Sequence, residues 1–236
     1  MEPLVSVIMP VRNGGDYLQA AVDSILGQTE QRIELLLVDD HSDDSAITAL
    51  ECDDPRLLIL ASEGRGVSSA FNTGMAQVSG SFIARMDADD GAFATRFQRQ
   101  MELIQSDRRI ALCGGGIVYF PREAVRDGAL RYEGWINGLL THEAMVRDIF
   151  VECPIPHPTF LFRADMVELT GGYRAMGWPE DYDLVLRLWE GGGRFAKVPE
   201  VVLRWRERGE RLSRTHEDYS AGAFRRCKVH LLSRTL

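Results

Sequence analysis

The sequence contains no long apolar run. Its apolar runs, such as residues 33–38, extend over about half a dozen residues, whereas a membrane-spanning helix needs roughly 20. Met1 is followed almost at once by a strand-like run over residues 5–9, without the basic n-region and apolar h-region of a signal peptide. We therefore expect no transmembrane segment and a cytoplasmic protein.

Clustered cysteines and two common glycine motifs are also absent. Cys52, Cys113, Cys153 and Cys227 lie far apart without a C-x-x-C pair, which argues against a zinc or redox centre and favours reduced thiols packed as small apolar residues. Residues 10–15 read Pro-Val-Arg-Asn-Gly-Gly, which is not the G-x-G-x-x-G turn of a dinucleotide-dependent dehydrogenase, and no P-loop sequence occurs. A dinucleotide-dependent dehydrogenase and a P-loop enzyme are therefore excluded.

Basic residues are fewer than acidic ones, 27 against 35, and they are unevenly distributed along the chain. The net charge of -8 argues against a general nucleic-acid binder. Between Arg204 and Arg234, however, nine Lys and Arg face four Asp and Glu, a net of +5 that leaves -13 for the rest. This basic segment is either an ordinary solvated face or a contact for an anion such as a diphosphate, a lipid headgroup at a membrane surface, or RNA.

What is present is the pattern of one α/β domain over residues 1–236. The length, with 45% hydrophobic and 26% charged residues, allows a single full-sized core. Short apolar runs alternate with helical periods in the first half, which predicts a mostly parallel central sheet flanked by helices. We expect strands over 5–9, 33–38, 57–61, 82–86, 110–113, 159–162 and 198–205, and helices over 18–26, 45–51, 67–78, 139–150, 182–189 and 217–232.

Acidic and turn-forming residues follow three of these strands directly. In an open α/β sheet, ligands collect beyond the carboxyl ends of the strands, which selects residues 10–14, 39–42 and 87–90. Asp87, Asp89 and Asp90 are the strongest signal, because three carboxylates within four residues repel one another unless a cation or solvent compensates. A divalent metal would relieve that repulsion and neutralise a diphosphate, and oxygen ligands suit Mn²⁺ or Mg²⁺. An acidic turn in solvent is the alternative interpretation.

Nearly the whole chain resembles family-two glycosyltransferases, which have the GT-A fold. The resemblance lies in residues 5–45, 66–90 (ending in RMDADD), 157–173, 178–207 (beginning with WPEDYD) and 211–220, in that order. It implies an inverting glycosyltransferase that takes a sugar from a nucleotide-diphosphate sugar, with UDP the commonest nucleotide in the family. It also implies a nucleotide-binding half over residues 1–90 and an acceptor-binding half over 91–236 that includes the basic C-terminal segment.

The resemblance assigns roles to individual residues. Pro10, Asn13 and Asp40 would surround the donor nucleotide, and Asp89, helped by Asp87, would hold Mn²⁺ or Mg²⁺ beneath the diphosphate. Glu180 and Asp181 match the catalytic Glu-Asp pair of the family. A general base must lie across the anomeric carbon from the leaving group, and Asp181 is the candidate. A position near a helix N-terminus would keep its carboxylate ionised at neutral pH.

The prediction also gives possible roles to three arginines of the basic segment and to the side chains of His157 and Trp178. Arg206, Arg211 and Arg214 would pair with the donor phosphates, although a surface arginine is more often only solvated. His157 lies near the acceptor or metal, or else is structural in a Pro-constrained turn. Trp178 either stacks on an acceptor or packs in the core.

Two positions depart from the family pattern, and two other functions stay open. Phe71 stands where many relatives have an arginine, which removes a phosphate contact, and Ala94 replaces a common proline. A sugar-phosphate nucleotidyltransferase would carry a better basic glycine loop than residues 12–15. A non-catalytic sugar-nucleotide-binding module would have no use for Asp181 as a base. The acceptor is left unidentified: a glycan, a lipid-linked sugar or another substrate.

Overall fold

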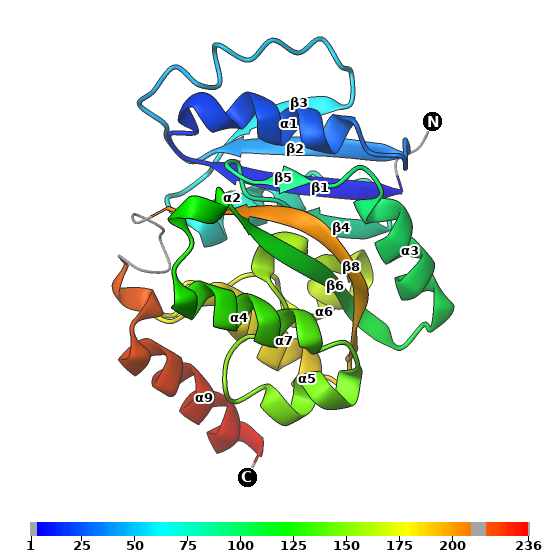
Figure 1. Cartoon of the computed structure of the whole chain (residues 1–236), viewed down its shortest axis with the longest axis vertical. Helices are drawn as coiled ribbons and strands as arrows, with labels where there is room; N and C mark the ends of the chain where they lie inside the picture. The colour runs from blue at the N-terminus through cyan, green and yellow to red at the C-terminus, as the bar shows by residue number, and fades with distance from the viewer. Residues whose placement is uncertain (1–3, 209–215, 236) are drawn as a thin grey trace.

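A computed structural model describes residues 4–208 and 216–235 of the chain (Figure 1). One mixed sheet runs through the molecule, with strand order β3-β2-β1-β4-β7-β6-β8-β5. Its strands are β1 (Val5–Val11), β2 (Ile33–Asp39), β3 (Leu57–Ala61), β4 (Phe82–Arg85), β5 (Gly91–Ala92), β6 (Ile110–Phe120), β7 (Leu161–Arg163) and β8 (Arg194–Arg206). The sheet is mostly parallel, because only β7 and β5 run antiparallel to their neighbours. The predicted fold class is confirmed.

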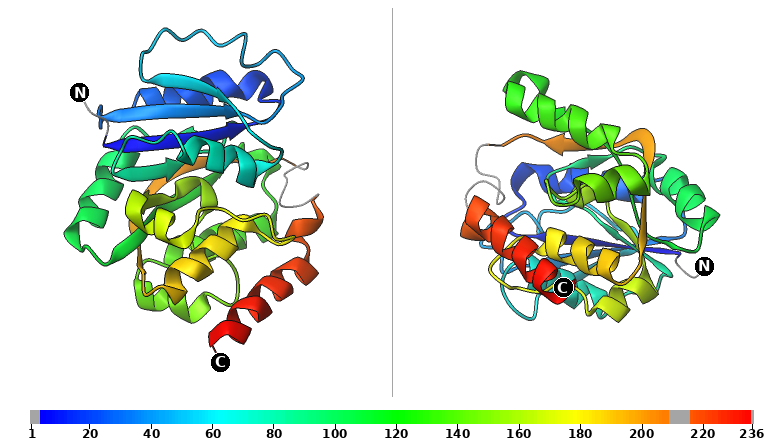
Figure 2. Two further views of the ribbon diagram at one scale, coloured as in Figure 1. Left: turned by 180° about the vertical axis from the view of Figure 1, so that it is seen from behind. Right: turned by 90° about the horizontal axis from the view of Figure 1, so that it is seen from below.

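Helices cover both faces of the sheet (Figure 2). They are α1 (Leu18–Leu26), α2 (Val67–Met75), α3 (Arg96–Ser106), α4 (Asp127–Gly138), α5 (His142–Asp148), α6 (Ala164–Thr170), α7 (Glu180–Glu190) and α9 (Ala221–Thr235). β1 and β2 are buried on both faces, so their alternate side chains enter two apolar cores. One core includes α1 and α3, and the other includes α2 and α7. Parallel strands covered on both sides require such continuous apolar runs.

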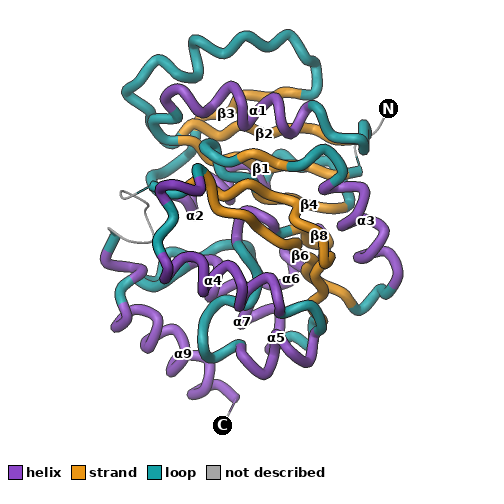
Figure 3. The backbone as a smooth tube through the Cα atoms, viewed as in Figure 1, coloured by secondary structure: helices purple, strands orange, loops and turns teal. Residues whose placement is uncertain are grey.

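Glycine allows β6 and β8 to pair closely in the second half. The register between these two parallel strands shifts around Gly115 and Gly116. A Cβ atom on Gly115 would lie 2.3 Å from Cγ2 of Val202, and one on Gly114 would lie 2.3 Å from Cγ2 of Ile155. These contacts are too short for any side chain, so Gly114 and Gly115 are packing residues. β6 and β8, which are strands in Figure 3, are both longer than the sequence predicted, and Tyr119 and Leu203 near their carboxyl ends are buried in the core.

Some predicted elements were wrong, and others were missed. Residues 45–51 form turns and no helix. The Asp44 carboxylate accepts hydrogen bonds from the backbone of Gly15 at 2.9 Å and of Ala46 at 3.2 Å. α3 was not predicted, although Phe97, Met101 and Ile104 follow a helical period and are buried. Its many polar residues hide that pattern.

Two sequence expectations bear on the type of protein. No helix within the described residues is long and apolar enough to cross a membrane. Cys52, Cys113, Cys153 and Cys227 are all free thiols, and the last three are buried, as expected for small apolar side chains.

Candidate functional site

A cavity of about 1070 Å³ lies beyond the carboxyl ends of β1, β2 and β4. Residues predicted from three strand ends and from the start of α7 all line it, although they are far apart in sequence. They are Pro10, Asn13, Asp40, Asp87, Asp89, Glu180 and Asp181. The acidic strand end and the Glu-Asp pair therefore open into the same space, large enough for a substrate molecule.

The loops after β1 and β2 are fixed to each other at one end of this cavity. Asn13 has a positive φ of 56°, and its side-chain oxygen accepts a hydrogen bond from Asp43 N at 2.9 Å. Asp40 is buried, and both of its carboxylate oxygens accept from Gly66 N, at 3.0 and 2.9 Å. Asp40 thus also holds the residue that begins α2. The structure therefore places Asn13 and Asp40 as supports of this end of the cavity.

Three carboxylates cluster directly after β4. One ligand atom from each of Asp87, Asp89 and Asp90 lies within 4.8 Å of the others. Asp87 forms an ion pair with Arg85, and Asp89 forms one with Arg208 at 3.0 Å. Hard carboxylate oxygens at this spacing fit Mg²⁺ or Mn²⁺. Asp87 and Asp89 face the cavity, whereas Asp90 is buried and accepts a hydrogen bond from a backbone N–H of β8.

Arg206 contacts the loop of residues 87–90 and is not among the residues that line the cavity. Its guanidinium lies 3.8 Å from the ring centre of Tyr17 and 4.3 Å from that of Phe120. Its Nε donates to the backbone oxygen of Asp89 at 2.8 Å. Within the described residues of this segment, the arginine that lines the cavity is Arg208, which sequence reasoning did not single out. Arg211 and Arg214 lie outside the described residues.

Glu180 and Asp181 are the first two residues of α7 and line the same cavity. Asp181 accepts a hydrogen bond from Tyr182 N at 2.7 Å through Oδ1. Glu180 is buried and accepts one from the Tyr219 hydroxyl at 2.6 Å. Tyr219 belongs to the short helix η4 (Glu217–Tyr219) next to α9, so the C-terminal segment directly contacts the predicted catalytic pair.

Burial sets the charge state of this pair. It raises the pKa of Glu180 to about 7, with the adjacent Asp181 charge adding to the effect. It raises the pKa of Asp181 to about 6; the hydrogen bond from Tyr182 N opposes the shift and the charge of Glu152 adds to it. Burial therefore outweighs the helix N-terminus that the sequence suggested would dominate.

The neighbouring His157 and Trp178 are both held in place by hydrogen bonds. His157 shares a hydrogen bond of 2.6 Å with the Tyr173 hydroxyl, and burial beside Arg85 lowers its pKa well below the usual range. It is therefore a neutral imidazole. Trp178 donates through Nε1 to Asp183 at 3.1 Å. Both side chains line the cavity, so their predicted functional and structural interpretations are compatible.

Several further side chains line the cavity without having been predicted. Glu152, whose pKa burial raises, acts electrostatically on Asp181. Tyr132 of α4 and Trp205 of β8 form part of the wall, with ring centres 6.4 Å apart. Arg85 is the last residue of β4. An isolated charge within an apolar run was the available signal for both Glu152 and Arg85.

This combination of fold and site defines a class of protein. A sheet of this strand order, with an acidic cluster after an inner strand and a carboxylate pair across one cavity, is the arrangement of GT-A fold glycosyltransferases. The sequence agrees, because residues 6–169 match the model of the family described as Glycosyl transferase family 2. The chain belongs to this family and is a glycosyltransferase.

Named relatives and solved structures support the assignment. The chain is 28% identical over 226 residues to the putative glycosyltransferase EpsE of Bacillus subtilis (strain 168), covering 92% of this chain and 78% of EpsE. It is 30% identical over 191 residues to the O-antigen biosynthesis glycosyltransferase WbnJ of Escherichia coli, covering 78% of this chain and 71% of WbnJ.

Two solved structures have the same fold at low sequence identity. S. aureus TarS 1-349 in complex with UDP-GlcNAc superposes with a TM-score of 0.77 at 18% identity, covering 97% of this chain and 66% of that one. The mannosyltransferase PcManGT from Pyrobaculum calidifontis, in complex with GDP-Man and Mn²⁺, gives a TM-score of 0.69 at 18% identity, covering 89% and 59%. This chain thus spans 66% of the length of the TarS fragment and 59% of the length of the PcManGT chain.

Proposed function

We propose that this chain is an inverting glycosyltransferase that transfers a sugar from a UDP-sugar to an acceptor hydroxyl. One observation carries the proposal: Asp89 and Asp181, predicted to act on the leaving group and on the acceptor, line the same cavity. Residues with those two roles must reach one small substrate from two sides. The proposed uridine nucleotide is supported by the UDP-GlcNAc and UDP complexes of TarS.

Asp89 and Asp87 would hold a divalent cation at the donor diphosphate. The cation supplies positive charge that stabilises the leaving group. In favour of this role, both carboxylates border the cavity and lie within ligand distance of each other. Each of the two carboxylates already pairs with a cationic side chain, Asp87 with Arg85 and Asp89 with Arg208, which supports a role in binding positive charge. The complex of PcManGT with Mn²⁺ is consistent with manganese as the metal.

Asp181 serves as the general base in this proposal. The acceptor oxygen attacks the anomeric carbon as the bond from that carbon to the β-phosphate oxygen breaks, and the electron pair of that bond leaves with the nucleoside diphosphate. The hydroxyl proton passes to the Asp181 carboxylate. Attack from the side opposite the leaving group inverts the anomeric centre. Glu180, with the higher pKa, holds the start of α7 against Tyr219 and positions Asp181.

A thermal-shift screen of nucleotide sugars tests the proposed donor. We expect a UDP-sugar to raise the melting temperature when Mn²⁺ is present, and to do so much less when EDTA removes the metal. A ligand that binds only the folded state stabilises it according to its concentration over its dissociation constant, by about 2.7 kcal/mol at a hundredfold excess. A shift with GDP-sugars alone would reassign the nucleotide. The same shift with and without metal would contradict the cation site.

The pKa of Asp181 predicts how activity depends on pH. A base must be ionised to accept a proton, so activity should rise with pH and reach half its plateau near pH 6. Release of nucleoside diphosphate from the donor found by the screen, with water as acceptor, provides the measurement between pH 4.5 and 8.5.

Glu152→Gln is the control for this assignment. Glu152 raises the pKa of Asp181 through its negative charge, so removing that charge should move the midpoint to lower pH. A profile that falls with rising pH, or a midpoint that Glu152→Gln leaves in place, would assign the titration to another group.

A further inference from the structure

Arg85 carries a buried charge with one partner. Its side chain is 8% exposed, and its contact within the described residues is the ion pair with Asp87. Its Nη1 atom faces Asp87 in that ion pair, and its enclosed Nε atom makes no hydrogen bond with the described residues. A guanidinium has five N–H donors, and burying such a charge without acceptors is costly. Arg85 therefore has donor capacity that the protein itself does not use.

A second buried arginine shows that the fold can satisfy such a group when the group is structural. Arg96, in the first turn of α3, is fully buried, and all three of its side-chain nitrogens donate. Their acceptors are Gln100 Oε1, Met86 Sδ and the backbone oxygen of Arg85. Arg96 is not among the residues that line the cavity, whereas Arg85 is. The difference indicates that the partner of Arg85 is a ligand.

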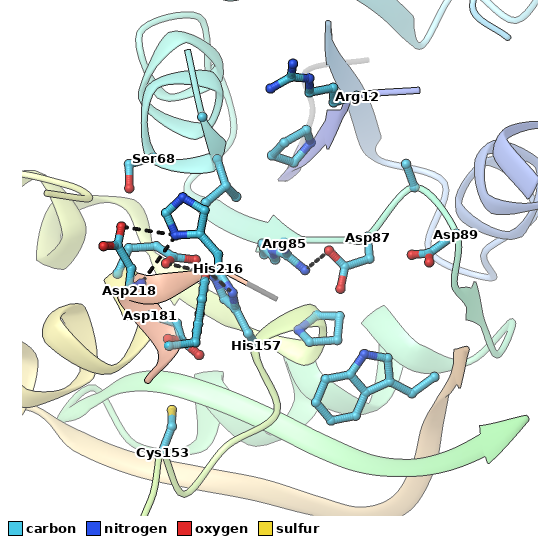
Figure 4. A pocket seen from close by; sticks show the side chains of 18 of the residues that line it. Arg12, Ser68, Arg85, Asp87, Asp89, Cys153, His157, Asp181, His216 and Asp218 are labelled. Carbon is cyan, nitrogen blue, oxygen red and sulfur yellow. Dashed lines mark hydrogen bonds and ion pairs between the residues drawn. The ribbon is translucent and has the colours of Figure 1, made fainter. Parts of the chain in front are cut away.

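The position of Arg85 selects the part of the substrate that it would meet. Arg85 ends β4, two residues before Asp87, and its charge also acts on Glu180 and Asp181 across the cavity. In the view of Figure 4, the Arg85–Asp87 pair lies between Asp181 and Asp89. Its guanidinium is thus placed near the junction of the leaving group and the transferred sugar.

Electrostatics then distinguishes a phosphate from the sugar as the ligand. Positive charge develops at the anomeric carbon as its bond to the leaving oxygen breaks, so a fixed cation aimed at that carbon would oppose the reaction. The same cation beside the β-phosphate stabilises the negative charge that accumulates there. A planar guanidinium also suits two parallel hydrogen bonds to phosphate oxygens.

We propose that Arg85 is a built-in phosphate-binding residue that receives the β-phosphate of the donor, in addition to the cation held by Asp87 and Asp89. The inference rests on the proposed function, because it needs a nucleoside diphosphate in the cavity. Phe71, which replaces the basic residue expected on α2, is buried with its ring centre 4.3 Å from that of Tyr173. Phe71 therefore supplies no charge to the cavity, whereas Arg85 at the end of β4 does.

Calorimetric titration of nucleoside monophosphates and diphosphates, in both the uridine and guanosine series with Mn²⁺, tests the proposal. Wild type should bind a diphosphate more tightly than the matching monophosphate. Arg85→Met should weaken diphosphate binding roughly tenfold or more and monophosphate binding less than about twofold. Arg85→Lys should fall between, because it keeps the charge and loses the planar fork. Arg109→Met, at an exposed arginine before β6, should bind as wild type does.

Melting with each nucleotide separates a binding role from a structural one. Arg85→Met leaves Asp87 without its ion-pair partner, so the ligand-free variant melts at a lower temperature in either case. If Arg85 receives the β-phosphate, the variant should lose most of the shift caused by the diphosphate and keep most of the shift caused by the monophosphate. Equal weakening of both nucleotides would make Arg85 a structural partner of Asp87 and overturn the proposal. Unchanged discrimination in Arg85→Met would overturn it too. If wild type bound none of these nucleotides, the proposed donor site itself would fail.

Discussion

Replacing Asp181 with Asn should lower turnover by about 10²–10⁴-fold while donor affinity changes less than about threefold. The asparagine keeps the shape of the side chain and cannot accept the proton of the attacking hydroxyl. Because the cation site and the nucleotide end are untouched, binding of the nucleotide sugar should survive. Donor hydrolysis, followed by release of nucleoside diphosphate, and calorimetric titration of the same donor measure the two quantities separately.

A loss of folding would not explain such a result. The folded protein holds Asp181 at a pKa of about 6, above its usual 3.8, so the folded state binds more protons between those values. This group therefore contributes stability at low pH that is lost as pH rises through 6. At pH 7.5 the half-buried, ionised carboxylate destabilises the fold, and Asp181→Asn should melt at or above the wild-type temperature.

The chain supplies a matched control for this variant. Asp165 is the second residue of α6, as Asp181 is of α7, and its Oδ1 likewise accepts from the next backbone N–H, at 2.9 Å. It is exposed and does not line the cavity. Asp165→Asn should retain full activity. Comparable turnover in Asp181→Asn and wild type would remove Asp181 from the mechanism, whereas donor binding without any turnover in wild type would favour a binding module over a catalyst.

Replacing Asp89 with Asn should abolish the metal dependence of donor binding and reduce turnover by roughly 10²–10³-fold. Metal ions contribute several kcal/mol of charge stabilisation to such a leaving group, and each 1.36 kcal/mol is a factor of ten in rate. Neutral amide oxygen is a weaker ligand than carboxylate for Mn²⁺. Titration of Mn²⁺ in the presence of a nucleoside diphosphate, with manganese observed by electron paramagnetic resonance, measures the loss directly.

Asp107→Asn is the control for the loss of an arginine-paired carboxylate. Asp107 pairs with Arg109 at 2.8 Å before β6, away from the cavity, as Asp89 pairs with Arg208. It should bind manganese and turn over as wild type does. If Asp89→Asn kept its manganese affinity, the cluster would be a charge-balanced acidic turn, and the leaving group would depend on arginines alone.

The strand ends of the first half could be predicted from sequence because burial on both faces leaves an unmistakable apolar run. Residues 33–38 and 82–85 are such runs, and the loops that follow β1, β2 and β4 meet at one cavity as the strand-end rule requires. Asp40, Asp87 and Asp89 were placed correctly for that reason. Their predicted roles depend on the variants described above.

Side chains whose direction depends on tertiary pairing could not be predicted. Arg206 and Arg208 are only two residues apart. Arg206, which is paired with Phe120 of β6 at the end of β8, donates to the backbone of Asp89, whereas Arg208 lines the cavity. The sequence marks Arg85 only as an isolated charge within an apolar run, and the lack of a hydrogen-bond partner at its Nε can be seen only in the assembled fold. The pKa of Asp181 likewise reflects burial by neighbours that lie far apart in sequence.

The central claim is that one cavity holds the leaving diphosphate on a cation at Asp89 and presents Asp181 to the other side of the anomeric carbon. A crystal structure with Mn²⁺ and the nucleotide sugar that gives the largest thermal shift, with manganese located by anomalous scattering, tests it most directly. We predict manganese on the Asp89 carboxylate between two phosphate oxygens, and Asp181 opposite the bond that breaks. Manganese elsewhere, or Asp181 on the same side as the diphosphate, would contradict the account.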